Sequence, residues 1–487
     1  MNSDGTPAPR TSPLPKGIDS IPEWDAFVDE EIRRNRTETF RLRVVDKEGA
    51  PLAGRSMEIQ QKDLDFTLGV CPNGHVSVCN ELACGTDEAS DLYWEWIGEL
   101  FNATTLWWGW RVTEPRPGEY AFDQACEGSH TVRRDDPESG ETFWDEHPRM
   151  IGPWEAMLER ARKLDHKLTG HALLYPRGDV APRWINPLPA EEAKRHLEEV
   201  VRYTVRRYRD EVSVWHPVNE NFPGLQKVGP FEIDEGEVYR WVREEAPKAE
   251  LVNNGGYEIE PDFFEQAIRN ADRQGVSIDT LGIRGYHELY YADDLDGYLR
   301  RWNHFNDLIN RYGKWLRYTE IGANSKVARN GIHDPKLFVS GSAMNEGIVA
   351  VEPRDGKLPV LTEATQTEFL VRMYKLIFAH PAMKECSYWD LLDDFTWNFC
   401  EGGLITADRR PKLAYTALKQ LFHEEWRTQT TVTTDAEGVL EFTGYRGDYE
   451  ISVEGSGTIA CDLSTPRSTA KASEPISLTV ETQFQDA

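Results

Sequence analysis

The sequence predicts an α/β protein, a (β/α)8 TIM barrel with a small accessory β-sandwich built from N- and C-terminal segments. Eight short apolar runs in the middle of the chain are each followed by a stretch with helical apolar spacing, which is typical of repeated βα units. Alternating polar and apolar runs near both ends indicate short antiparallel strands. A doubly wound open sheet is the alternative, but no Gly-rich phosphate loop follows the first run.

The barrel elements can be placed along the chain. Amphipathic helices are expected between the strands, and 190–210 and 365–380 show the helical spacing most clearly. Two long connections, 123–150 and 324–362, would shape a cleft over the barrel mouth, and a closed pocket there would favour exo cleavage. The eight predicted strands are 66–70, 103–110, 167–175, 212–219, 249–253, 278–286, 316–322 and 385–392.

The terminal regions divide the chain further. Residues 1–22 are polar and Pro-rich, which predicts a flexible leader. Residues 23–65 form an N-terminal β segment, and two alternating runs within 38–70 flank a Gly-Ala-Pro turn that predicts a β-hairpin. The barrel is expected over 66–426 and a C-terminal β module over 427–487. We expect the two β regions to pack together as one sandwich that braces the barrel, with glycan binding by this module as the alternative.

Composition disfavours several classes of function. The 487 residues carry 55 basic and 83 acidic side chains, and the net charge of −28 argues against nucleic acid or an anionic membrane surface as a partner. No apolar window of about 20 residues and no secretory signal occurs in the sequence. The compartment is left open: secreted or periplasmic if a signal precedes these residues, otherwise cytoplasmic. The seven cysteines form no CxxC pair, and His147, His166 and His171 lack metal-site spacing, so neither metal nor cofactor is expected. We expect a monomer or a small homo-oligomer.

Two glutamates at predicted strand ends indicate a chemistry. Glu220 follows the run at 212–219, and Glu320 lies near the end of the run at 316–322, 100 residues later. In a closed barrel this spacing of three βα units brings both to facing sides of one mouth, where such barrels place their chemistry. Two opposed carboxylates can hydrolyse a glycosidic bond, and a separation of about 5–5.5 Å would give retention of configuration. The alternative is two salt-bridged residues on the barrel rim.

Six segments around these residues follow one another in a recognisable order. They are TEPRPGEYAFDQAC (113–126), GHALLYPRGDVAPRWI (170–185), WHPVNE (215–220), YTEIG (318–322), WDLLDDFTW (389–397) and GLITADRRPKLAYTAL (403–418). Through these segments the chain, from about residue 66 to 425, resembles glycoside hydrolase family 10, the endo-β-1,4-xylanase family. The resemblance implies a divergent member that hydrolyses a plant- or microbe-derived β-linked glycan by double displacement, with Glu320 as nucleophile and Glu220 as acid/base.

Several side chains near the two glutamates are candidates for substrate binding. Asn219 can hold a sugar hydroxyl, Trp397 can form a flat floor for a sugar ring, and His171 can orient its neighbours from inside the barrel. Donors are also needed to keep Glu320 ionised. The candidates are Arg284, Tyr286 and His287 for that task, and Tyr175, Trp389, Trp107 and Trp108 for contact with sugar.

The chain departs from the family at the positions where a xylanase binds the hydroxyl groups of its sugar substrate. In TLWWGW (105–110) other residues stand where the family has its Glu, Asn and Lys. Tyr175-Pro176 stands where the family has Trp-His. Residues 284–287 can be aligned with the family's Gln-x-His in more than one register, so His287 either replaces the family's His or does not. Trp107 and Trp108 favour stacking over directional hydrogen bonds, although strand alternation turns one of them towards the helices. We therefore expect a modified or branched β-glycoside rather than plain linear xylan, with an inactive carbohydrate-binding barrel as the alternative.

Overall fold

The structure is a computed structural model of the 487-residue chain. It describes residues 8–72, 81–135, 142–176, 181–220, 227–257, 263–287, 289–326, 353–389, 391–393, 401–453, 457–464 and 474–480.

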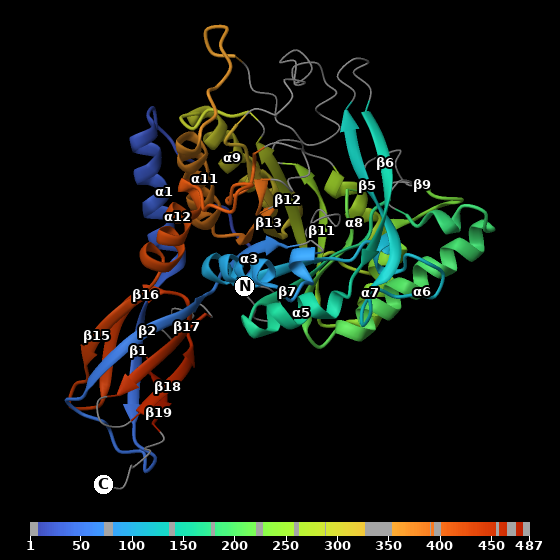
Figure 1. The fold of residues 1–487 in the computed structure, drawn as a ribbon. Coiled ribbons are helices and arrows are strands. Elements are labelled where there is room, and N and C mark those ends of the chain that lie inside the picture. The colour runs from blue at the N-terminus through green and yellow to red at the C-terminus, as the bar shows by residue number, and fades with distance from the viewer. Residues whose placement is uncertain are drawn as a thin grey trace.

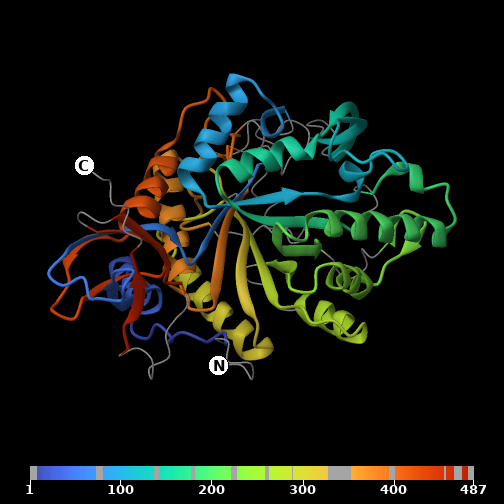
Figure 2. The same ribbon diagram turned by 90° about the horizontal axis from the view of Figure 1, so that it is seen from below.

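A closed barrel of eight parallel strands forms the centre of the molecule, in the order β11-β12-β13-β14-β3-β4-β7-β8 (Figures 1 and 2). This confirms the predicted barrel and rules out the open doubly wound sheet. Every strand agrees with one of the eight apolar runs. The strands are β3 (Thr67–Cys71), β4 (Ala103–Trp107), β7 (Lys167–Leu174), β8 (Val212–Val218), β11 (Glu250–Tyr257), β12 (Thr280–His287), β13 (Trp315–Ala323) and β14 (Met383–Trp389).

Helices surround the barrel and bury their apolar faces against it. In α6 the buried positions Leu197, Val201 and Val205 repeat every fourth residue, so one face of this helix covers the strands. A reciprocal pair of hydrogen bonds between Thr362 and Thr365 caps the start of α11. The covering helices are α3 (Glu88–Leu100), α5 (Trp154–Lys163), α6 (Ala190–Tyr208), α7 (Glu235–Glu245), α8 (Phe263–Arg273), α9 (Leu295–Tyr312), α11 (Glu363–Ala379) and α12 (Leu413–Gln420).

Shorter elements fill the connections between strands and helices. β5 (Cys126–Asp135) and β6 (Thr142–Ile151) form an antiparallel ribbon within the long connection predicted at 123–150, and the ribbon extends away from the barrel (Figure 1). Of the long connection at 324–362, residues 327–352 lie outside the described part of the chain. The other short elements are α4 (Trp110–Thr113), β9 (Lys227–Val228), β10 (Phe231–Glu232), the 3₁₀ turn Arg183–Ile185 and the π turn Leu421–Glu425.

The N-terminal residues differ from the prediction. From residue 8 on, the predicted flexible leader is held against α9: the Ser12 amide donates to Asn306 Oδ1 at 2.8 Å, and the Asn306 amide donates to Ser12 O at 3.1 Å. Ile21–Arg36 is a helix, α1, where a β segment was expected from residue 23. The Pro-rich composition gave no sign of this docking, because the partner residues lie almost 300 positions away in the sequence.

The terminal strands form a two-sheet sandwich. One sheet has the order β16-β1-β19 and the other β15-β2-β17-β18, and the apolar side chains between them include Phe40, Ile59 and Phe442. The predicted hairpin over 38–70 is wrong, because its two runs join opposite sheets and each pairs with a C-terminal strand. The strands are β1 (Thr37–Val45), β2 (Ser56–Leu64), β15 (Gln429–Thr433), β16 (Val439–Tyr445), β17 (Gly447–Val453), β18 (Gly457–Asp462) and β19 (Ile476–Thr479).

The sandwich is attached to the end of the barrel where the strands begin. Only Asp65 and Phe66 separate β2 of the sandwich from β3 of the barrel. The buried Arg36 guanidinium donates to the carbonyls of His380 and Met383, both at 2.8 Å, at the start of β14. Figure 1 shows the sandwich at the end of the molecule away from the ribbon. Among the helices that the described residues form, none is long and apolar enough to span a membrane.

Candidate active site

Glu320 lies on β13 at the barrel mouth and is 3% exposed. The Asn254 amide donates to its Oε1 at 2.7 Å, and the Tyr286 hydroxyl donates to its Oε2. His171 Nε2 lies 3.9 Å from Oε1. The groups in direct contact with this carboxylate are uncharged, because burial lowers the pKa of His171 to about 4, an effect that Glu320 only partly counteracts. The charged Arg284 is near enough to interact with Glu320 electrostatically.

An irregularity in the strand pairing sets the direction of this side chain. Ile283 of β12 pairs with Tyr318, but the next residue, Arg284, pairs with Glu320, so Thr319 is an extra residue on β13. Thr319 and Glu320 are consecutive, yet both side chains reach Asn254. The bulge therefore turns two neighbouring side chains towards the same interior amide.

Asn254 links the two strand ends that carry the glutamates. Its side-chain amide donates to Asn219 Oδ1 and to Glu320 Oε1, both at 2.7 Å, while its Oδ1 accepts from the Thr319 hydroxyl. It is 0% exposed. The sequence analysis missed this residue because the predicted strand stopped at 253. The signal that could have found it is the Asn253-Asn254 pair after an apolar run, the same pattern that marked Asn219.

Glu220 follows β8 and receives a different set of donors. Arg284 Nη1 donates to its Oε1 and the Tyr175 hydroxyl to its Oε2, and the side chain of Glu220 is 16% exposed whereas that of Arg284 is 1% exposed. The Glu220 backbone has φ +50°, a left-handed conformation that a non-glycine residue rarely adopts, and its N–H donates to Asn254 O at 3.2 Å. Arg284 was expected to support Glu320. It donates directly to Glu220, and it also interacts electrostatically with Glu320, whose charge raises the pKa of Arg284 against the effect of burial.

An apolar surface and a histidine pair complete the mouth. Cys71, Tyr286, Trp389 and the half-buried Trp107 pack together there. The His171 ring meets Trp389 edge to face with centroids 5.0 Å apart, and His171 Nδ1 lies 2.8 Å from Nδ1 of His216. Trp107 and Trp389 therefore lie at the mouth, and His171 contacts Trp389, His216 and Glu320 from inside the barrel.

Two predicted site residues face the helices instead of the mouth. Trp108 is 0% exposed and stacks on Tyr208 of α6 with centroids 4.6 Å apart. His287 is 3% exposed and packs against Phe369 of α11 at 4.5 Å. Side chains alternate along a strand, so each lies on the opposite face from its neighbour Trp107 or Tyr286. Both assignments to substrate binding are therefore wrong, and Trp397 lies outside the described residues.

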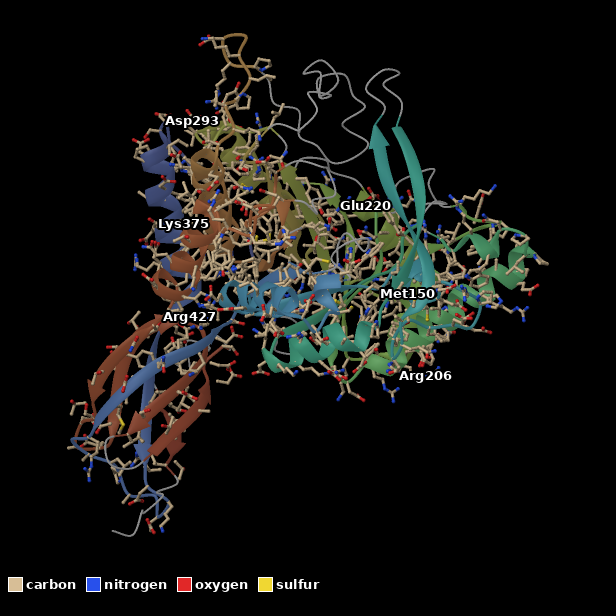
Figure 3. All side chains as sticks on the ribbon, viewed as in Figure 1. Met150, Arg206, Glu220, Asp293, Lys375 and Arg427 are labelled. Atoms are coloured by element: carbon tan, nitrogen blue, oxygen red, sulfur yellow. The ribbon has the colours of Figure 1, made fainter. Side chains whose placement is uncertain are left out.

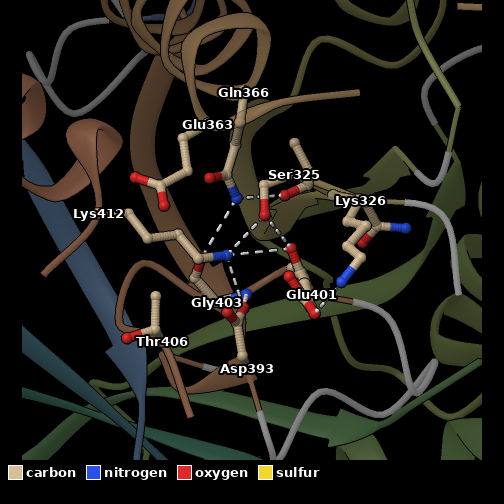
Figure 4. Close-up of polar contacts among 12 residues, drawn as sticks. Ser325, Lys326, Glu363, Gln366, Asp393, Glu401, Gly403, Thr406 and Lys412 are labelled. Atoms are coloured by element: carbon tan, nitrogen blue, oxygen red, sulfur yellow. Dashed lines mark hydrogen bonds and ion pairs between the residues drawn. The ribbon is translucent and has the colours of Figure 1, made fainter. Parts of the chain in front are cut away.

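A buried ion pair ties together the two segments that follow β13 and β14 (Figure 4). Lys412 Nζ lies 2.6 Å from Asp393 Oδ1 and donates to Ser325 Oγ at 2.8 Å and to Glu401 O at 3.1 Å. Both charged side chains are almost fully buried, and burial raises the pKa of Asp393 to about 6 although Lys412 counteracts it. Ser325 lies shortly after the strand of Glu320, so this cluster, the rim clamp, fixes the chain next to the site.

Figure 3 shows Glu220 on the side of the barrel where the ribbon rises, while Arg427 marks the junction with the sandwich. The candidate site and the sandwich therefore lie at opposite ends of the barrel. Among the described residues, no group of three or more His, Cys, Asp or Glu side chains could hold a metal ion.

Comparison with known proteins identifies the family. The family model described as glycosyl hydrolase family 10 matches residues 152–421, more than half of the chain. The chain belongs to glycosyl hydrolase family 10. The relatives of this chain have low sequence identity to it. Endo-1,4-beta-xylanase B of Thermotoga neapolitana is 24% identical over 309 residues, which cover 58% of this chain and 78% of that protein.

Two other proteins are similar to the chain at low sequence identity. The anti-sigma-I factor RsgI6 of Acetivibrio thermocellus is 21% identical over 465 residues, 92% of this chain but only 49% of that protein. Xylanase 10B from Thermotoga petrophila, solved with xylobiose, is 18% identical with a TM-score of 0.48, covering 74% of this chain and 95% of that one. The family 10 chain described here is a divergent glycoside hydrolase of the xylanase type.

Proposed function

We propose that this family 10 enzyme is a retaining β-glycoside hydrolase in which Glu320 is the nucleophile and Glu220 the acid/base. The environment of Glu320 carries the proposal. An amide and a phenol fix both of its oxygens without neutralising the charge, so the carboxylate stays available to a developing positive charge at the anomeric carbon. Glu220 follows β8, and its neighbour Asn219 is linked to Glu320 through Asn254.

The proposed reaction has two steps with balanced proton transfer. Glu220 first gives its proton to the glycosidic oxygen while Glu320 attacks the anomeric carbon, which releases the leaving sugar and forms a glycosyl ester on Glu320. Water then attacks the same carbon, Glu220 takes the water's proton, and Glu320 leaves as a carboxylate. Two inversions give net retention of configuration.

The proposed substrate is a modified or branched β-linked glycan rather than plain linear xylan. Thr105 and Leu106 lie on the barrel strand where the family carries sugar-binding polar residues, and both are buried. Trp107, Trp389 and Tyr286 offer apolar area for stacking in their place. A site that reads fewer hydroxyls through hydrogen bonds discriminates less against a substituted sugar.

Labelling with a mechanism-based reagent tests the nucleophile. The protein is incubated with a 2-deoxy-2-fluoro-β-xylobioside carrying a dinitrophenyl leaving group, and peptide mapping by mass spectrometry should place one glycosyl group on Glu320. Glu320→Ala should remain unlabelled. A label on another residue would contradict the assignment, and so would an α-configured first product in a proton NMR time course.

The contact between Glu220 and Arg284 favours one alternative, a carbohydrate-binding barrel without turnover, because an ion-paired carboxylate carries no proton to donate. A panel of aryl β-glycosides distinguishes the two functions. The enzyme proposal expects turnover of at least one glycoside that is lost in Glu320→Ala. Complete absence of turnover, together with unchanged glycan affinity in Glu320→Ala, would establish the binding function.

A further inference from the structure

We propose that Arg284 is a positioning residue that holds Glu220 in its ionised form in the resting site, so that cleavage of substrates with poor leaving groups is confined to acidic pH. This inference rests on the proposed role of Glu220 as acid/base. It goes beyond that role because it assigns a second residue to the control of the proton and predicts the conditions under which the enzyme works.

Arg284 is a buried residue of a barrel strand and not a residue of the loops at the barrel rim. It lies in the middle of β12, pairs in register with Glu320 of β13 and is 1% exposed. Gly282 and Gly285 are its close neighbours on the strand. Burial lowers the pKa of Arg284 and the nearby charge of Glu320 counteracts this, and an arginine side chain is not deprotonated in proteins, so the guanidinium is charged.

The groups that face Glu220 come from four strands. Tyr175, after β7, donates to Oε2 and Arg284, on β12, donates to Oε1. From β11 the Asn254 carbonyl accepts the Glu220 N–H. Glu320 on β13 is a negative charge nearby, already held by two uncharged donors. Among the residues that the structure describes, Arg284 is thus the cation in contact with this carboxylate.

Both oxygens of Glu220 therefore accept hydrogen bonds, one of them from a permanent cation, and this arrangement favours the carboxylate over the carboxylic acid. The two steps of the reaction need opposite forms. Cleavage requires Glu220 with its proton, whereas hydrolysis of the glycosyl ester requires Glu220 as a base. Arg284 opposes the first role and supports the second.

Leaving groups separate these effects. A dinitrophenolate departs without protonation, so its release does not depend on the form of Glu220. A sugar alkoxide or an alkylphenolate needs the proton, so its release should decline once Glu220 is ionised. The contribution of Arg284 should consequently appear only with poor leaving groups.

The test compares Arg284→Gln, which removes the charge but keeps a polar side chain, with Arg284→Lys, which keeps the charge. For each, kcat/KM is measured from pH 4 to 9 with 4-methylphenyl and 2,4-dinitrophenyl β-xylobioside. With the methylphenyl substrate, Arg284→Gln should move the basic limb of the profile up by about 1–2 pH units, whereas Arg284→Lys should leave it near its original position. With the dinitrophenyl substrate, the pH at which kcat/KM declines should stay the same in every variant, even if the value of kcat/KM itself differs.

An unmoved basic limb in Arg284→Gln would overturn the inference, and so would an equal movement with both substrates. The unaltered protein supplies a second measurement that needs no folded variant. Across a series of aryl β-xylobiosides, log kcat/KM should fall steeply with leaving-group pKa at pH 7.5 and only slightly at pH 5. Equal slopes at the two pH values would also overturn it.

Glu220→Gln separates this inference from the proposed function. Strong loss of activity on the methylphenyl substrate, together with an unmoved limb in Arg284→Gln, would reject the role of Arg284 alone. Full activity of Glu220→Gln on that substrate would reject Glu220 as the acid/base, and the inference with it.

Discussion

The two ends of the barrel interior each bury an arginine among carboxylates, yet they differ in how the negative charges are compensated. At the floor, Arg317 donates through two nitrogens to Glu250, at 2.9 and 3.0 Å, and lies 2.5 Å from Glu385. At the mouth, three residues further along the same strand, Glu320 is held by the uncharged Asn254 and Tyr286. We define the floor cluster as Arg317, Glu250 and Glu385.

The difference separates charges that support the fold from a charge that can react. Burial alone would raise the pKa of Glu250, but Arg317 and Lys384 outweigh it and hold that pKa far below its usual range. Such a carboxylate is neutralised by its partners. Glu320 accepts its hydrogen bonds from uncharged groups, and Arg284, the cation near it, donates to Glu220 instead of pairing with it directly. Its carboxylate can therefore stabilise a positive charge that develops in the mouth.

The largest effect should come from removing the carboxylate of Glu320. Glu320→Ala should lower kcat by on the order of 10⁴-fold or more, because the covalent route is lost, while the melting temperature changes little. Kinetics with an aryl β-glycoside and calorimetry measure both. Added azide should restore part of the rate by attacking the opened face of the anomeric carbon, and a variant with activity close to the original would contradict the role of Glu320.

Breaking the floor cluster should affect stability and not chemistry. Arg317→Met leaves Glu250 and Glu385 buried without their common partner, so we expect a loss of about 3–5 kcal/mol in the free energy of unfolding. Urea titration checks this. In conditions where the variant remains folded, kcat per active site should stay within about twofold; a large change in kcat would show that floor and mouth are coupled.

The rim clamp provides an intermediate case. Lys412→Met removes a buried cation of similar exposure, and we expect a comparable loss of stability, about 3–5 kcal/mol. Because the clamp also holds Ser325 and Glu401 beside the mouth, KM should rise in this variant, which is not expected for Arg317→Met. An unchanged KM would place the clamp with the floor as a purely structural cluster.

The uncharged support of Glu320 can be tested by itself. Asn254→Ala removes the amide that joins Glu320 to Asn219, and we expect kcat to fall by about 10²-fold as the carboxylate loses its fixed orientation. Asn253→Ala, one residue away with its side chain bonded to Tyr239, is the matched control and should retain kcat. Similar losses in both variants would indicate general damage to β11.

The smallest expected effect concerns pH and stability. Burial lowers the pKa of His171 to about 4, so between pH 6.5 and 4 the unfolded chain binds a proton that the folded chain does not. The free energy of unfolding should therefore decrease as the pH is lowered through this window. The contribution of His171 to this decrease should be about 2 kcal/mol between pH 7 and pH 5. His171→Gln should show a correspondingly shallower dependence in thermal melts; an unchanged slope would mean that His171 is charged in the fold.

Apolar runs and polar strand ends were sufficient to predict the barrel and the place of Glu220 and Glu320, because a closed barrel brings strand ends together whatever the loops are. The partners of Arg284 could not be predicted, since its long side chain can reach either glutamate from β12 and only packing decides between them. The sandwich pairing also escaped, because a period of two identifies a strand but not its neighbour. The face of Trp108 was undecided for a related reason, as apolar residues suit both sides of a parallel strand.

The sandwich has a consequence for how the protein is made. Leu42 of β1 pairs with Leu440 of β16, so the ribosome adds 398 residues after the first strand before its partner exists. At roughly 5–20 residues per second, β1 and β2 wait for about 20–80 s with an apolar face and open edges. During that time they are the part of the nascent chain most in need of a chaperone, and a product terminated before residue 429 would keep both edges open and be a substrate for degradation.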